Sequence, residues 1–209
     1  MMEIIDCEQG SQEWLQARLG IPTASMYATV MAKGKGTAPS LTRTTYLYKL
    51  LGERITGDPA ENYQNHHMER GHEMEVDARN MYAFMNDVDP VLVGFIRNVK
   101  TGASPDALIG ENGLLEIKTK LPHLLLPHLL SGSVPPEHKA QVHGQIWIAE
   151  REWCDFVAYW PNIRPLIIRV YRDDDYIRNM AHEVEMFNEE LDALEQKYGA
   201  LAKLEKPSC

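Results

Sequence analysis

Three charged residues near the middle of the chain have the types and spacing that phosphodiester cleavage can use. Asp106 follows Ser104-Pro105, and nine residues separate it from the run Glu116-Ile117-Lys118. Carboxylate oxygens suit Mg²⁺, which keeps several of its waters and accepts phosphate oxygens. A nearby lysine can orient or deprotonate the attacking water and stabilise the charged transition state. These residues therefore predict a metal-dependent nuclease site, with the carbonyl of Ile117 as a further metal ligand.

A strand and a turn must bring these groups together. Residues 114–120 alternate as a strand does, so Glu116 and Lys118 should project from one face of it. Gly110-Glu111-Asn112-Gly113 is typical of a turn, and a hairpin there would carry Asp106 back toward Glu116. The alternative is an ion pair on a solvated strand face, which needs no catalytic purpose.

The other elements are expected to be mostly helical in the first half of the chain and mixed in the second. Helices are expected at 11–19, 23–31, 40–55, 63–85, 137–149 and 173–203. Strands of the catalytic sheet are expected at 91–96, around 103–109 and at 114–120, and a further pair at 153–160 and 166–171. Residues 121–130 are apolar but interrupted by prolines and histidines, so they are expected to form an ordered loop.

The composition favours one enzyme domain, 1–209, because 44% hydrophobic residues can fill a sizeable core without splitting the chain. The charge opposes a protein that coats nucleic acid over its whole surface, since 30 acidic and 21 basic residues give a net charge of −9. Contact with DNA is compatible with this balance if it is confined to a concave lining where lysines and arginines gather.

The cysteines, the histidines and the amino terminus indicate a cytoplasmic protein without structural zinc. Cys7, Cys154 and Cys209 lack the paired spacing of a zinc or thiol redox site, so reduced thiols are expected. The eight histidines form no recognised ligand set. The first residues resemble no secretory signal, and no segment approaches the roughly 18–20 apolar residues of a membrane-spanning helix.

Arg18, Thr23 and Ser25 form a second group with possible chemistry. A guanidinium can grip a phosphate with two hydrogen bonds, and hydroxyls at a helix start add donors beside exposed backbone amides. The alternative is that Thr23 caps its helix and Arg18 forms a surface ion pair.

A basic loop, Lys33-Gly34-Lys35-Gly36-Thr37, lacks the full pattern of a nucleotide-binding loop, so no ATP site is predicted. Its composition suits contact with a duplex backbone, and a solvated surface loop is an equal alternative.

Four ordered blocks of the sequence carry a family resemblance. They are residues 9–25, which include Gln9-Gly10-Ser11-Gln12-Glu13-Trp14-Leu15, then 71–79, 104–118, and 140–147, Ala-Gln-Val-His-Gly-Gln-Ile-Trp. Together they resemble the phage lambda exonuclease family, also called YqaJ-like viral recombinases or alkaline exonucleases, of the PD-(D/E)XK nuclease superfamily. The resemblance implies an α+β restriction-endonuclease-like fold with an α/β core, in which helices flank a central mixed sheet. Relatives carry a glutamine and an aromatic residue where this chain has His143 and Gly144.

The resemblance also implies roles for individual residues. Arg18, Thr23 and Ser25 correspond to residues that hold the 5′-phosphate of the degraded strand. Glu75, which could instead simply pair with Arg79 on its helix, corresponds to a ligand of a second metal ion. Met68 occupies the place of an apolar wedge at the duplex end, although most helix methionines are packing residues. The implied catalytic residues are Asp106, Glu116, Lys118 and Gln141; the implied metal ligands are Glu75, Asp106, Glu116 and Ile117.

One further glutamine shares the helix of Gln141. Gln145 lies one turn on and can face the same site, where an amide could orient water or a phosphate. An ordinary polar helix face is the alternative for Gln145.

The function implied is a Mg²⁺-dependent, processive 5′-to-3′ exonuclease on linear double-stranded DNA. Two Mg²⁺ ions per site are expected, with Mn²⁺ as a substitute. The enzyme would release 5′-mononucleotides and leave 3′ single strands for recombination by a phage single-strand annealing protein. A homotrimeric ring around the DNA, in the cytoplasm of a bacterial host carrying a phage or prophage, completes the expectation. The alternatives are a restriction or junction-cleaving endonuclease and a non-catalytic DNA-end-binding protein.

Overall fold

A four-stranded mixed sheet lies at the centre of the computed structural model, which describes residues 1–34, 36, 40–60 and 66–204, without the side chains of 66–73 and 204. Its strands, in spatial order, are β4 (Ala107–Ile109), β5 (Gly113–Thr119), β6 (Trp153–Tyr159) and β7 (Leu166–Tyr171). β4 and β5 form the predicted hairpin, β5 and β6 run parallel, and β7 returns antiparallel. β5 and β6 are largely buried, as expected for strands covered on both faces.

A second, three-stranded antiparallel sheet lies beside it, in the order β1 (Met2–Ile5), β2 (Phe95–Asn98) and β3 (Thr101–Ala103). The strand predicted at 91–96 was therefore placed too early, since Val91 forms only an isolated bridge with Leu108. The single strand predicted around 103–109 was also wrong. The chain leaves one sheet after Ala103 and joins the other at Ala107, because Pro105 cannot donate to a strand ladder.

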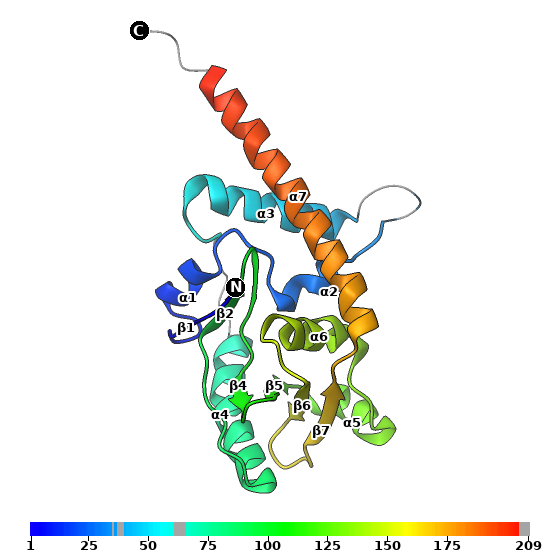
Figure 1. Ribbon diagram of the computed structural model, residues 1–209. Helices are drawn as coiled ribbons and strands as arrows, with labels where there is room; N and C mark the ends of the chain where they lie inside the picture. Colours follow the sequence, from blue (N-terminus) through cyan, green and yellow to red (C-terminus); the bar gives the residue numbers. More distant parts are fainter. Residues whose placement is uncertain (35, 37–39, 61–65, 205–209) are drawn as a thin grey trace.

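Helices cover both faces of the central sheet (Figure 1). α4 (His66–Asn86) packs on one face of β5 and β6, and α6 (Lys139–Ile148) packs on the other. α7 (Asp174–Leu204) crosses α3 (Leu41–Thr56) and α6, and its last turns extend beyond the rest of the fold (Figure 1). The shorter helical segments are α1 (Gln12–Ala17), η1 (Ala24–Met26), α2 (Tyr27–Val30), α5 (Pro122–Ser131) and η2 (Pro136–His138).

Helix α5 contradicts the loop that the sequence predicts at 121–130. Pro122 occupies the first turn, where a missing N–H costs nothing, and Gly132 ends the helix in the left-handed conformation. Pro127 removes one hydrogen bond inside the helix, but Leu125 is fully buried and anchors the segment to the core. Tertiary packing thus overrides the proline signal.

Two apolar clusters fill the space above and below the central sheet. Leu115 and Ile117 point toward α4 and pack with Ala78 and Tyr82. Leu114, on the opposite face of β5, belongs to the larger cluster that includes α6 and α7. Because side chains alternate along a strand, Glu116 and Lys118 lie on the same face as Leu114, which is the face covered by α6.

Candidate active site

The β4–β5 hairpin brings the three predicted catalytic residues together. The backbone N–H of Ile117 donates to the carboxylate of Asp106, whose own N–H donates to the carbonyl of Leu115 at 3.0 Å. The Nζ of Lys118 lies 2.5 Å from Oε1 of Glu116. The side chain of Glu116 is only 1% exposed, so this ion pair does not sit on the solvated face that the alternative interpretation requires.

Burial makes the two carboxylates unfavourable neighbours. Desolvation raises the pKa of Asp106 well above its usual value, and the charges of Glu116 and Glu75 raise it further, against the opposing effect of Lys118. Burial alone would lower the pKa of Lys118, but Glu116 and Asp106 outweigh it and raise this pKa to about 12. The site therefore concentrates negative charge around one ammonium group.

Two glutamines of α6 hold the buried carboxylate of Glu116. The amide of Gln141 donates to Oε1 and the amide of Gln145 donates to Oε2, each at 2.5 Å. Gln145 is itself buried, so the polar helix face considered for it from the sequence is wrong. The four-residue spacing of the glutamines was the available signal, but only the sheet beneath α6 shows that both amides point inward.

The departure from the family pattern at His143 and Gly144 has a packing explanation. A Cβ on Gly144 would lie 2.6 Å from the Tyr27 ring and 3.0 Å from the Cβ of Ala24, so glycine allows η1 to approach α6 closely. His143 is buried against the ring of Tyr176, at 4.9 Å between centroids, and burial lowers its pKa. These two positions thus set how α6 packs.

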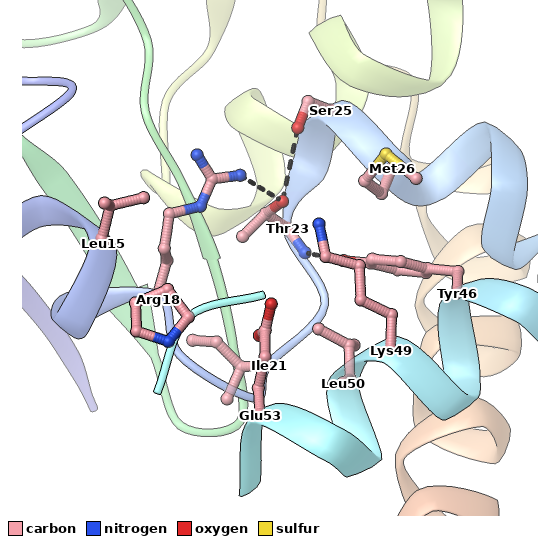
Figure 2. Close-up of a pocket in the computed structure, with 11 residues that line it drawn as sticks. Leu15, Arg18, Ile21, Thr23, Ser25, Met26, Tyr46, Lys49, Leu50 and Glu53 are labelled. Carbon is pink, nitrogen blue, oxygen red and sulfur yellow. Dashed lines mark hydrogen bonds between the residues drawn. The ribbon is translucent and has the colours of Figure 1, made fainter. Parts of the chain in front are cut away.

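A pocket of about 260 Å³ contains the second predicted group (Figure 2). Arg18 donates to the hydroxyl of Thr23 at 3.1 Å, and the hydroxyls of Thr23 and Ser25 lie 3.3 Å apart. The Thr23 hydroxyl forms no capping bond to its helix, and Arg18 forms no ion pair within the described residues, so neither alternative use is seen. Lys49, which the sequence did not single out, extends from α3 into the same pocket.

The pocket also has one acidic wall. Glu53 is buried, and its carboxylate accepts hydrogen bonds from the backbone of Gly20 at 3.0 Å and of Ala60 at 3.3 Å. Burial lowers the pKa of Arg18, whose guanidinium is packed over the Trp14 ring. Because Glu53 is engaged by backbone donors, the cationic and hydroxyl groups of Arg18, Thr23 and Ser25 stay available to an anion.

A scan against protein families matches residues 13–152 to the YqaJ-like viral recombinase domain. The chain belongs to this family. A comparison with curated proteins found no match.

Two solved structures of an alkaline exonuclease, LHK-Exo from Laribacter hongkongensis, are similar to this member of the YqaJ-like family over nearly its whole length. One shares 34% identity, covers 92% of this chain and 98% of its own, and has a TM-score of 0.83. The other, a complex with dAMP, has 34% identity, coverages of 93% and 100%, and a TM-score of 0.84. The α+β fold of PD-(D/E)XK type, predicted from the sequence, is thereby confirmed.

A phage-related exonuclease from Haemophilus somnus 129PT shares the fold at 13% identity, with a TM-score of 0.66 over 85% of this chain and 96% of its own.

The oxygen donors of this YqaJ-like site fit a divalent cation. Among the residues that the structure describes, no three His, Cys, Asp or Glu side chains gather closely enough to form a complete ligand set. Mg²⁺ needs only one or two carboxylates beside its waters. Asp106 and Glu116 supply two, and in the described part of the chain Lys118 is the cation that balances them. Glu75 pairs with Arg79 at 3.3 Å and shares a cavity of about 440 Å³ with Asp106.

The remaining sequence predictions are only partly covered. The side chain of Met68 and residues Lys35 and Thr37 of the basic loop lie outside the described part of the structure. A role for the Ile117 carbonyl as a metal ligand stays a prediction.

Cys7 and Cys154 are free thiols. Across the described residues, none of the helices is both long and apolar enough to cross a bilayer.

Proposed function

We propose that the protein is a Mg²⁺-dependent exonuclease that degrades one strand of linear double-stranded DNA from the 5′ end. The observation that carries this proposal is the pairing of two sites: an anion pocket at Arg18, Thr23 and Ser25, and a buried carboxylate–lysine site at Asp106, Glu116 and Lys118. A terminal phosphate held in the first site would place a nearby phosphodiester in the second. An endonuclease has no need of a terminal-phosphate pocket.

The relatives support the reaction class and the product. LHK-Exo is an alkaline exonuclease at 34% identity, and one of its structures is a complex with dAMP, a deoxynucleoside monophosphate. A site that binds such a molecule in a relative supports release of 5′-mononucleotides here, which leaves a 3′ single strand.

The residues of the carboxylate–lysine site would have separate roles in catalysis. Asp106 and Glu116 would hold one Mg²⁺, with Glu75 contributing to a second, and the bound ions would supply Lewis-acid activation of water and stabilisation of the leaving oxygen. Mn²⁺ would substitute, since it accepts the same oxygen ligands. Lys118, whose raised pKa keeps it cationic at neutral pH, would stabilise negative charge that develops on the phosphate. Gln141 and Gln145 hold Glu116 in position.

The biological setting is proposed from the family resemblance. A homotrimeric ring around the DNA would make degradation processive, because a ring threaded by its product cannot easily dissociate between cuts. The 3′ strand would pass to a phage single-strand annealing protein. The unpaired spacing of the cysteines supports action in a reducing compartment such as the cytoplasm. The bacterial host, like the ring, is proposed from the family resemblance.

A duplex labelled separately at each 5′ and 3′ end, beside a covalently closed circle, tests the proposal. With Mg²⁺, early release of the 5′ label as mononucleotide and an intact circle are expected. Cutting of the circle would instead establish an endonuclease. No cleavage of either DNA with Mg²⁺ or Mn²⁺ would indicate a DNA-end-binding protein.

A further inference from the structure

One aromatic side chain contacts both halves of the proposed active site. The indole Nε1–H of Trp14 donates to the hydroxyl of Ser104 at 2.8 Å, and Ser104 is two residues before Asp106. On the other side, the guanidinium carbon of Arg18 lies 3.9 Å from the centre of the Trp14 ring. A single ring therefore joins the residue assigned to the terminal phosphate with the segment that carries a catalytic carboxylate.

The Trp14 side chain is stiffer than the Arg18 side chain that it contacts. Trp14 has two side-chain torsions, and its helix is held in place at the far end, where Arg97 of β2 donates to the carbonyl of Ala17. The side-chain amide of Gln9 donates to the carbonyl of Pro105, the residue before Asp106, and to that of Val93, at 2.9 Å each. Arg18 is long and rotatable, so the Trp14 ring restricts where its charge can lie.

The distance between the two sites decides how many nucleotides are removed. If the 5′-phosphate rests at Arg18, Thr23 and Ser25, the bond over Asp106 is the first, second or third phosphodiester according to that distance. If Arg18 could move relative to the catalytic carboxylates, the enzyme could cut at more than one phosphodiester, counted from the 5′ end.

We propose that Trp14 is a positioning residue that fixes the spacing between the phosphate pocket and the catalytic carboxylates, and so sets the product length at one nucleotide. This inference rests on the proposed exonuclease function. The Trp14–Ser104 hydrogen bond would then influence which phosphodiester is cut, in addition to any effect on the rate of cleavage.

Two conservative variants isolate the hydrogen bond. Trp14→Phe keeps an aromatic ring under Arg18 and removes the N–H donor together with part of the indole, while Ser104→Ala removes only the acceptor hydroxyl. Trp153→Phe is a matched control, because Trp153 also stacks on an arginine, with the Arg169 guanidinium 3.6 Å from its ring centre. Trp153 begins β6 opposite Gly113 and lines neither the phosphate pocket nor the cavity beside Asp106.

The measurement is the length distribution of the earliest products from a linear 5′-phosphorylated duplex, determined by mass spectrometry at matched extents of digestion. Wild type and Trp153→Phe are expected to release mononucleotides. Trp14→Phe and Ser104→Ala should each raise the fraction of di- and trinucleotides about tenfold, equivalent to about 1.4 kcal/mol and of the size of one hydrogen bond. The double variant should match the single variants, because both remove the same bond.

Release of mononucleotides alone by both variants, at any rate, would overturn the assignment of product length to Trp14. Should Trp14→Phe fail to fold in a thermal melt, Ser104→Ala decides the matter by itself. If wild-type protein releases no nucleotides, the proposed exonuclease function fails and this inference fails with it. If the variants digest DNA but the product length is unchanged, only this inference fails.

Discussion

Gln145 donates its side-chain amide to Oε2 of Glu116 at 2.5 Å, from a position where it is 1% exposed to solvent. A buried carboxylate depends on such donors, because an ionised group without hydrogen bonds is costly in the protein interior. Glu116 thus relies on α6 for two amide donors and on its own strand for Lys118.

Replacement of Gln145 by methionine should therefore impair catalysis more than folding. Methionine has a similar length but cannot donate to Glu116, and loss of such an outer contact typically costs about 10–100-fold in activity or metal affinity. The rate of mononucleotide release and its dependence on Mg²⁺ concentration would measure this. Gln196→Met, at an exposed position of α7, is the control and should behave as wild type. Equal activity of both variants would show that Gln145 has no part in holding the site.

Lys118→Ala should abolish most metal-dependent turnover while leaving DNA binding intact. The lysine lies 2.5 Å from Glu116 inside the proposed catalytic site, so we expect a loss of about 10²–10³-fold in kcat. Single-turnover digestion and a gel-shift assay would separate the two effects. Lys120→Ala is the matched control, because Lys120 lies two residues further on and pairs with Glu137 at 2.9 Å. A variant that retains full turnover would remove Lys118 from the mechanism.

Arg18→Ala should remove the preference for phosphorylated ends. A charge-assisted hydrogen bond contributes about 1.5–3 kcal/mol, so the ratio of initial rates on 5′-phosphate and 5′-hydroxyl duplexes should fall about 10–100-fold. Arg178→Ala changes an exposed arginine of α7 and serves as the control. If the ratio stays at its wild-type value, the pocket does not read the terminal phosphate.

Gly144→Ala should destabilise the protein, since the new methyl group would collide with the Tyr27 ring at 2.6 Å. Overpacking of this kind costs about 1–3 kcal/mol, and each kcal/mol should lower Tm by about 2–4 °C in a chain of this size. The same substitution at Gly199 of α7 meets nothing within 4 Å and should instead stabilise by about 0.5–1 kcal/mol. Thermal unfolding of the two variants gives opposite signs if the packing is as described.

Stability should fall in mild acid because of His138. Burial lowers its pKa from 6.5 to about 4, and the positive charges of Lys118 and Lys120 add to the effect. The unfolded chain then takes up a proton more readily than the folded protein, so stability is lost as the pH falls from about 6.5 toward 4.

The size of this acid effect should be roughly 1–3 kcal/mol, allowing for partial access of solvent. Urea unfolding of wild type and His138→Phe at pH 7.5 and pH 4.5 would measure it, with His182→Phe on the exposed side of α7 as the control. The pH-dependent loss should shrink only in His138→Phe. An identical loss in all three proteins would assign the acid sensitivity to other groups.

Local patterns in the sequence determined the central hairpin and the long helices. The turn at 110–113 and the alternation after it are close together in the sequence. These local features are enough to place Asp106 beside Glu116 and Lys118, as the hairpin shows. The helices predicted at 63–85 and 173–203 likewise agree with α4 and α7 to within a few residues, with 63–65 lying outside the described part of the structure. Family motifs assigned roles to Arg18, Thr23 and Ser25, and the fold brings these three into one pocket.

The tertiary structure alone decided which segments pair and which polar groups are buried. Strands β3 and β4 are three residues apart in the chain, yet they belong to different sheets, since β3 pairs with β2 and β4 pairs with β5. Burial of Gln145, and the bond from Trp14 to Ser104 across 90 residues, likewise depend on distant elements. A local window reports propensity and periodicity, whereas strand partners and buried hydrogen bonds follow from the packing of the whole chain.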